Sequence, residues 1–228
     1  MFPLFLSISF LNPLFRSLYV ALIAAFIALI VGAILGHLMA NHRFRGRLVI
    51  ETLLLMPLVL PPSVVGFGLL LLLGNHGPIG RAVTALFHEP IIFTVWAAMI
   101  ASTVVAFPLI YLTVKNGFEA VDPDVREAAA IDGANRWHRF FLIDLPLARS
   151  SLVTGGLLGF ARSMGEFGAT LMVAGNIPGK TQTMPTAIYL AVETNRLDLA
   201  WGWVISTLIL SFILLLTVQS LKRRANIQ

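Results

Sequence analysis

Two charged side chains stand four residues apart inside an apolar stretch of the chain. Arg162 and Glu166 lie within "GFARSMGEFGAT", so on a helix they share one face. A carboxylate beside a guanidinium suits acid–base chemistry, a structural ion pair or a group that meets an anion. Because an ionised side chain in the centre of a bilayer costs about 3 kcal/mol on insertion scales, the pair is expected to face protein or a cavity.

A second stretch, "AGNIPGKT" at residues 174–181, nearly reproduces the phosphate-binding loop G-x-x-x-x-G-K-[ST]. Its first position is Ala174, Pro178 removes an amide, and an apolar helix precedes it where the loop needs a strand. The sequence therefore excludes ATP binding at this stretch. The five histidines are scattered and the chain has no cysteine, so it offers no metal site, and no nucleophile stands beside a base.

Composition identifies the elements that must carry these residues. The chain has 228 residues, of which 57% are hydrophobic and 12% charged, against about a quarter charged in soluble proteins. Five apolar runs, near 17–40, 48–73, 91–114, 148–174 and 199–221, reach the roughly 20 residues needed to cross a bilayer. We expect an all-α polytopic membrane protein with one transmembrane domain over 17–222, an external or interfacial leader over 1–16 and a tail over 223–228.

The distribution of Lys and Arg predicts the orientation. Eleven of the sixteen lie in the first and third loops and the tail, four lie on the other side, and Arg162 lies within a span. Since cytoplasmic loops carry the excess of basic residues, the N-terminus is expected outside and the C-terminus inside. The basic residues are dispersed and no aromatic platform accompanies them, which excludes nucleic acid as a partner.

Prolines interrupt the second span. Pro57, Pro61 and Pro62 each remove an amide donor, and the carbonyls that lose a partner cannot face lipid. The break is therefore expected to be buried in protein or to line a water-filled path. A kink that serves packing alone is the alternative.

Charge is concentrated in the third loop, in "REAAAIDGANRWHRFFLIDLP" at 126–146. Asp122 and Pro123 are typical of a helix start and Gly133 of its end, and Asn135 can cap a second helix that ends before Pro146. On that second helix one face carries Trp137, Phe140, Phe141 and Leu145. This aromatic ridge suits a groove on a partner, or else it folds back on the chain's own helices.

The same stretch resembles a known signature. Glu127-Ala128-Ala129, Gly133, Ile143, Leu145 and Pro146 match, at every defined position, the EAA motif of permease subunits of bacterial ABC importers. The resemblance implies the type I ABC importer permease fold, with cytoplasmic coupling helices at about 119–146. It also implies a permease homodimer in the bacterial inner membrane, two ATPase subunits that bind the ATP and Mg²⁺, and a periplasmic or lipid-anchored binding protein. This chain would then be a transport subunit and not an enzyme.

Other stretches narrow the resemblance. "LPLVLPPSVVGFGLLLLLG", "GFARSMGEFGAT" and "NIPGKTQTMPTAIY" are similar to the molybdate importer permeases, and sulfate permeases are close relatives. The resemblance implies a path for an oxyanion, with molybdate first and tungstate, sulfate or thiosulfate as alternatives. A membrane-embedded enzyme that uses Arg162 and Glu166 is the alternative of another class.

Seven residues are candidates for the translocation path or gate. The Arg162–Glu166 pair either lines the anion's route as a gate or is a structural ion pair that fixes packing or dimer geometry. Hydroxyl and amide groups, such as Ser163, Thr170 and Asn176, are expected along the route. A GxxxG pair at Gly155 and Gly159 permits close helix approach and suggests a dimer interface. The path candidates are Pro57, Pro61, Pro62, Arg162, Ser163, Glu166 and Thr170.

Overall fold

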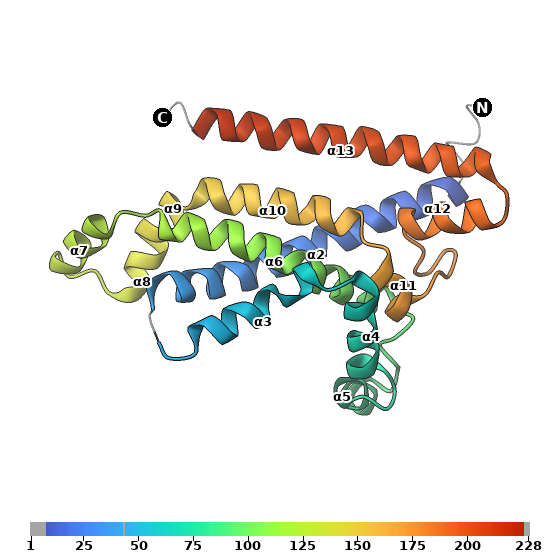
Figure 1. Ribbon diagram of the computed structural model, residues 1–228, viewed down its shortest axis with the longest axis horizontal. Helices are drawn as coiled ribbons and strands as arrows, with labels where there is room; N and C mark the ends of the chain where they lie inside the picture. Colours follow the sequence, from blue (N-terminus) through green and yellow to red (C-terminus); the bar gives the residue numbers. More distant parts are fainter. Residues whose placement is uncertain (1–7, 43, 226–228) are drawn as a thin grey trace.

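The computed structural model describes residues 8–42 and 44–225, and within them every regular element is a helix. Three helices form the centre of the molecule: α2 (Ile8–Asn41), α6 (Val95–Glu119) and α10 (Arg149–Met164). They lie side by side along the long axis (Figure 1). Small residues permit this close packing, since a Cβ on Gly32 or Gly36 of α2 would lie 3.2 Å from an atom of α6.

Helix α10 packs against α6 through its glycines. A Cβ on Gly155 would lie 3.1 Å from Val114, and one on Gly159 would overlap Ile110. The GxxxG pair therefore serves contacts within the chain. The face that carries these two glycines is occupied by α6 of the same chain, so a dimer interface formed by this helix would use another of its faces.

The second predicted span is broken, as the prolines indicate. Helices α3 (Arg47–Val59) and α4 (Pro62–Leu73) meet at an angle of 114°, with Pro61 in an extended conformation between them. Pro57 lies inside α3, whereas Pro62 is the first residue of α4, where its missing amide is not needed. The bend directs α4 away from the central helices, toward α5 (Pro78–Phe87) (Figure 1).

The fourth predicted span, 148–174, is also interrupted. Helix α10 ends at Met164 and a short helix, α11 (Gly168–Ala174), follows after three residues, 165–167. At 16 residues α10 is about 24 Å long, shorter than the roughly 30 Å of a bilayer's hydrocarbon core. The chain therefore does not form a single continuous helix over 148–174.

The last elements are α12 (Met184–Glu193) and α13 (Leu197–Ala225), which pack on one another. Among the described residues, three helices are long and apolar enough to cross a membrane, and the number rises to five if each of two bent helix pairs is one span. The chain is thus an all-α, multi-pass membrane protein. The start of α2 and the end of α13 lie toward opposite ends of the long axis (Figure 1).

The first described residues of the chain are helical. Residues 8–16, expected in a leader, are the first turns of α2 and are continuous with the first span. Phe10 is buried there and stacks on Trp203 of α13 at 5.5 Å between ring centroids. Residues 1–7 of the leader and 226–228 of the tail lie outside the described residues.

Candidate functional site

The charged third loop folds into short helices at one end of the molecule (Figure 1). Helix α7 (Pro123–Ile131) begins at Asp122, whose side chain accepts a hydrogen bond of 2.9 Å from the Asp124 amide. Gly133 ends the segment with φ +84°, a conformation that other residues rarely adopt. Asn135 caps α8 (Arg136–Arg139), accepting a 2.8 Å bond from the His138 amide. The predicted starts of both helices and the turn between them are confirmed.

The second helix continues beyond its predicted end. Helix α8 runs into a π-helix, η1 (Phe140–Asp144), and then into α9 (Leu145–Leu147), so Pro146 lies inside helical structure. The amide of Leu145 donates to the carbonyl of Phe140, five residues back, as a π-helix requires. Pro146 then falls in the first turn of α9, where no amide is needed. The prediction that the helix ends before Pro146 is therefore wrong.

This wider turn divides the aromatic ridge. Trp137 and Phe141 are 72% and 54% exposed and stack on each other, with ring centroids 6.2 Å apart. Phe140 instead points inward, 4.7 Å from the ring of His37 and 6.3 Å from that of Phe118. Leu145 packs in the same inner cluster. The ridge is thus divided: Trp137 and Phe141 are exposed, and Phe140 and Leu145 fold back on the chain.

The other residues of the EAA match follow the same division. Glu127 and Ala128 of α7 are exposed, as are Gly133 and Pro146. Ala129 and Ile143 are half-buried. The motif thus forms a continuous segment of which one side is open to a partner.

A buried carboxylate that the sequence reasoning did not single out anchors this segment. Asp144 is 3% exposed and contacts Arg126 Nε at 2.6 Å and His37 Nε2 at 2.9 Å. Arg126 also donates to the carbonyl of Phe118 at the end of α6, at 2.7 Å. Asp144 therefore ties η1 to α7 and α2. An acid inside the apolar run "FFLIDLP" was the available signal, because an acid in such surroundings needs partners.

The two broken spans meet at their breaks. A Cβ on Gly168, at the start of α11, would lie 3.0 Å from Pro62 Cβ at the start of α4. One on Gly66 of α4 would lie 2.8 Å from the Cα of Ala169. Helices α4 and α11 are therefore packed closely at their backbones.

The predicted Arg162–Glu166 pair is formed and spans the break after α10. Arg162 Nη1 lies 2.9 Å from Glu166 Oε2, and Glu166 Oε1 accepts a 2.9 Å hydrogen bond from the Ala169 amide of α11. The Glu166 side chain is only 2% exposed, whereas that of Arg162 is 33% exposed. Glu166 thus holds the end of α10 and the start of α11 together.

Two hydroxyl groups beside this pair find no hydrogen-bond partner among the described residues. Ser163 is 5% and Thr170 is 1% exposed, and the side-chain oxygen of each is buried and unpaired within the described chain. Buried hydroxyls are usually paired, so these two are candidates for contact with a group outside the chain. Pro61 and Pro62, by contrast, are exposed, and Pro57 is half-buried.

The "GNIPGKT" stretch uses its amides internally. The amides of Lys180, Thr181 and Gln182 all donate to the carbonyl of Ile177. They are therefore not directed at a phosphate, and the loop continues into α12.

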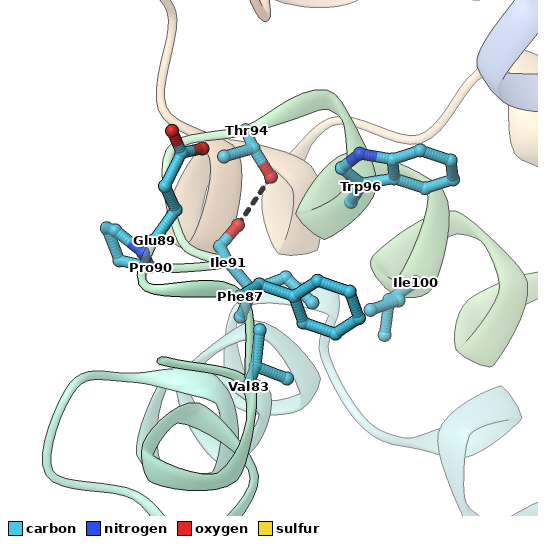
Figure 2. Close-up of a pocket in the computed structure, with 8 residues that line it drawn as sticks. All are labelled: Val83, Phe87, Glu89, Pro90, Ile91, Thr94, Trp96 and Ile100. Atoms are coloured by element: carbon cyan, nitrogen blue, oxygen red, sulfur yellow. Dashed lines mark hydrogen bonds between the residues drawn. The ribbon is translucent and has the colours of Figure 1, made fainter. Parts of the chain in front are cut away.

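A largely apolar pocket of about 430 Å³ lies where α5 meets the start of α6. Figure 2 shows Val83 and Phe87 from α5 and Trp96 and Ile100 from α6 around it. No residue predicted for the path or the coupling segment lines this pocket.

Comparison with known proteins gives a family match over most of the chain. Residues 28–227 match the family described as "Binding-protein-dependent transport system inner membrane component". The chain is 49% identical over 214 residues to the permease protein YvgM of Bacillus subtilis, covering 94% of each chain. It is 41% identical over 157 residues to the molybdenum transport system permease protein ModB of Escherichia coli, covering 69% of each. ModB of Azotobacter vinelandii is 38% identical over 186 residues, covering 81% of this chain and 82% of that protein.

Solved structures agree on the fold. A bacterial ABC transporter that imports the acidic polysaccharide alginate superposes with a TM-score of 0.75 at 15% identity, covering 97% of this chain and 82% of that one. A second structure of an alginate transporter, in complex with its alginate-loaded periplasmic protein, gives a TM-score of 0.74 at 16% identity, covering 98% and 81%. At these identities the likeness concerns the fold alone.

Proposed function

The chain belongs to the binding-protein-dependent transport system inner membrane components, so it is a transport subunit, and we propose that it forms the path for molybdate in an ATP-driven importer. The observation that supports molybdate as the transported anion is the similarity, over two thirds or more of each chain, to permeases named for molybdenum transport. Membership of this family also removes the alternative of a membrane-embedded enzyme.

The proposed topology has five spans, with the N-terminus outside the inner membrane of a bacterium and the C-terminus inside. It is supported by the eleven Lys and Arg residues assigned to one side and by the bent pair α3–α4, which passes as one span. The helices themselves alternate in direction along the long axis, from α2 through α3–α4, α6 and α10–α11 to α13 (Figure 1). This orientation places the segment α7–α9 in the cytoplasm.

The segment α7–α9 is the proposed contact with an ATPase. Its support is the EAA match together with the exposed, stacked pair Trp137 and Phe141, since aromatic side chains that are open to solvent are typical anchors of an interface. Two ATPase subunits would bind the ATP and Mg²⁺ and contact the two copies of this chain in a homodimer. Asp144 and Arg126 would transmit the movement to α2 and α6 because they join the segment to both.

The proposed gate is the contact between the broken spans. Its support is the backbone contact of α4 with α11 and the two unpaired hydroxyls of Ser163 and Thr170. Hydroxyl donors suit a divalent oxyanion that must bind and leave again, because fixed charges would hold it too tightly. In this assignment the Arg162–Glu166 ion pair maintains the geometry of the break, and the prolines at 57, 61 and 62 permit α4 to move.

In the proposed cycle a loaded external binding protein docks on the outer loops. Closure of the ATPase dimer on ATP moves α7–α9, and the permease pair changes from inward-open to outward-open to accept the anion. This chain supplies no catalytic residue and contributes the path and the mechanical link.

Uptake of radiolabelled molybdate tests the cargo. A strain that lacks the gene is expected to lose uptake and to regain it with the intact chain. Unlabelled molybdate and tungstate are expected to compete more strongly than sulfate. If sulfate competes best, the permease belongs to a sulfate importer and the molybdate assignment fails.

A further inference from the structure

A basic pocket lies between the charged segment and the central helices. It has a volume of about 290 Å³ and is lined by Arg126, Arg136, Arg139 and Asp144, together with His37 and Asn41 of α2 and His42, which follows α2. The exposed pair Trp137–Phe141 does not line it. The pocket therefore belongs to the segment proposed to contact the ATPase, but it lies apart from the exposed aromatic pair of that segment.

The charges in the pocket are not balanced. Asp144 is committed to Arg126 at 2.6 Å and to His37 at 2.9 Å. Among the side chains that the structure describes, those of residues 10–42 and 44–220, neither Arg136 nor Arg139 makes an ion pair. Counting only the arginines and the aspartate, two positive charges remain without a partner.

One of these arginines also has an unpaired buried donor. Arg139 is half-buried, and its Nε atom is shielded from solvent without a hydrogen-bond acceptor in the described chain. A buried N–H without an acceptor is unfavourable, so the site is incomplete as the chain stands alone. An anion in the pocket would supply the missing acceptor.

The arrangement of donors indicates which anion fits. Arg136 and Arg139 are three residues apart on α8, and residues at this spacing are neighbours on a helix. Guanidinium groups present planar, forked donors that match the oxygens of phosphate-like groups. The pocket is also a recess with room for a small anion and several waters.

We propose that the basic pocket binds a tetrahedral oxyanion. The group is a free anion such as phosphate, sulfate or molybdate, or the phosphate of a lipid at the membrane surface. In either case it joins α8 to α2 and so reinforces the link that Asp144 provides. The proposal does not depend on the cargo, and a carboxylate from the ATPase is the competing occupant.

The first arm of the test uses inorganic phosphate. The full chain is purified in dodecyl maltoside, and binding of ³²P-labelled phosphate is measured by equilibrium dialysis. We expect saturable binding that is at least tenfold weaker in the Arg136→Gln/Arg139→Gln variant. Arg149→Gln is the matched control, because Arg149 is exposed, is the first residue of α10 and does not line the pocket. The control is expected to bind like the unaltered chain.

The second arm tests the lipid source. The same proteins are placed in nanodiscs of a phosphate-free galactolipid with or without phosphatidylglycerol, and retained lipid is counted by native mass spectrometry. Phosphatidylglycerol retained by the unaltered chain and by the control, and lost from the double variant, supports a lipid phosphate. Binding in the first arm alone supports a free oxyanion.

The proposal is overturned if neither arm separates the double variant from the control. It is also overturned if the double variant differs only in ATPase association, since the arginines then meet a protein carboxylate. Size-exclusion profiles check folding, and Arg139→Lys provides a milder variant that keeps the charge and loses the fork. Neither arm measures molybdate uptake, so a failure of this proposal can be distinguished from a failure of the molybdate assignment.

Discussion

Replacing Asp144 tests whether the charged segment is held to the membrane helices by one buried carboxylate. In Asp144→Ala, Arg126 loses the contact at 2.6 Å and His37 the contact at 2.9 Å. Removing one partner of a buried ion pair costs about 3–5 kcal/mol. Arg126 is 19% exposed and keeps its bond to the Phe118 carbonyl, so we expect the lower end, about 3 kcal/mol.

This cost should appear as local opening of the segment. At about 1.4 kcal/mol for each factor of ten, a loss of about 3 kcal/mol raises the open population roughly a hundredfold. Amide hydrogen exchange in residues 136–144, measured by mass spectrometry on the purified chain, is expected to accelerate by a comparable factor. Amides in the middle of α6 should exchange at an unchanged rate, because their helix does not depend on the segment.

Asp132→Ala is the matched control for this experiment. Asp132 lies in the same segment but is exposed and makes no side-chain ion pair within the described chain. We expect its exchange pattern to equal that of the unaltered protein. Equal exchange in Asp144→Ala and Asp132→Ala would refute the assignment of Asp144 as the anchor.

Three further predictions follow from the contacts. Trp137→Ala should reduce co-purification of the ATPase with little change in thermal stability. Phe140→Ala removes a ring packed on His37 and Phe118 and should destabilise the permease itself by about 3 kcal/mol. Identical effects of the two variants would contradict the division of the ridge into exposed and inward-facing residues. Gly66→Ala places a Cβ 2.8 Å from the Ala169 backbone and should cost about 1–3 kcal/mol and slow uptake, while Gly68→Ala on the same helix meets nothing within 4 Å and should be neutral. Glu166→Gln should lower the unfolding temperature, because it leaves the Arg162 guanidinium without its carboxylate. Adding Arg162→Gln should restore part of that loss, because the uncompensated charge is then removed. If the effects of the two single variants simply add in the double variant, the ion pair is not supported.

Local chemistry in the sequence was sufficient for several elements. The starts of α7 and α8 followed from Asp122 and Asn135, whose side chains bond to amides two or three residues away. The break of the second span followed from Pro61 and Pro62, since proline removes an amide wherever it stands. These features depend on near neighbours, and near neighbours are visible in a sequence.

Features that depend on distant residues were missed. His37 and Asp144 are 107 residues apart, so their contact leaves no local pattern. The interruption at 165–167 was missed for a different reason: it lies in an apolar run, although the bond that stabilises it, from the Ala169 amide to Glu166, is local. Gly155 and Gly159 indicated close approach to a helix, but their spacing does not say which helix, and it is α6 of the same chain.

The π-helix explains the remaining difference. Periodicity of 3.6 residues placed Trp137, Phe140, Phe141 and Leu145 on one face. The wider turn over Phe140–Asp144 changes that register, so that Phe140 and Leu145 turn inward while Trp137 and Phe141 stay exposed. No composition signal marks such a turn, because it arises where the segment joins the bundle.

Reconstituted transport tests the central claim most directly. The purified permease and its ATPase are placed in proteoliposomes with ATP inside, and a molybdate-loaded binding protein is added outside. We predict that radiolabelled molybdate accumulates inside only when both ATP and the binding protein are present on these sides. Two results would contradict the assignment of this chain as the permease of a molybdate importer. One is accumulation of molybdate without ATP and without the binding protein. The other is no accumulation with both present, although the complex hydrolyses ATP.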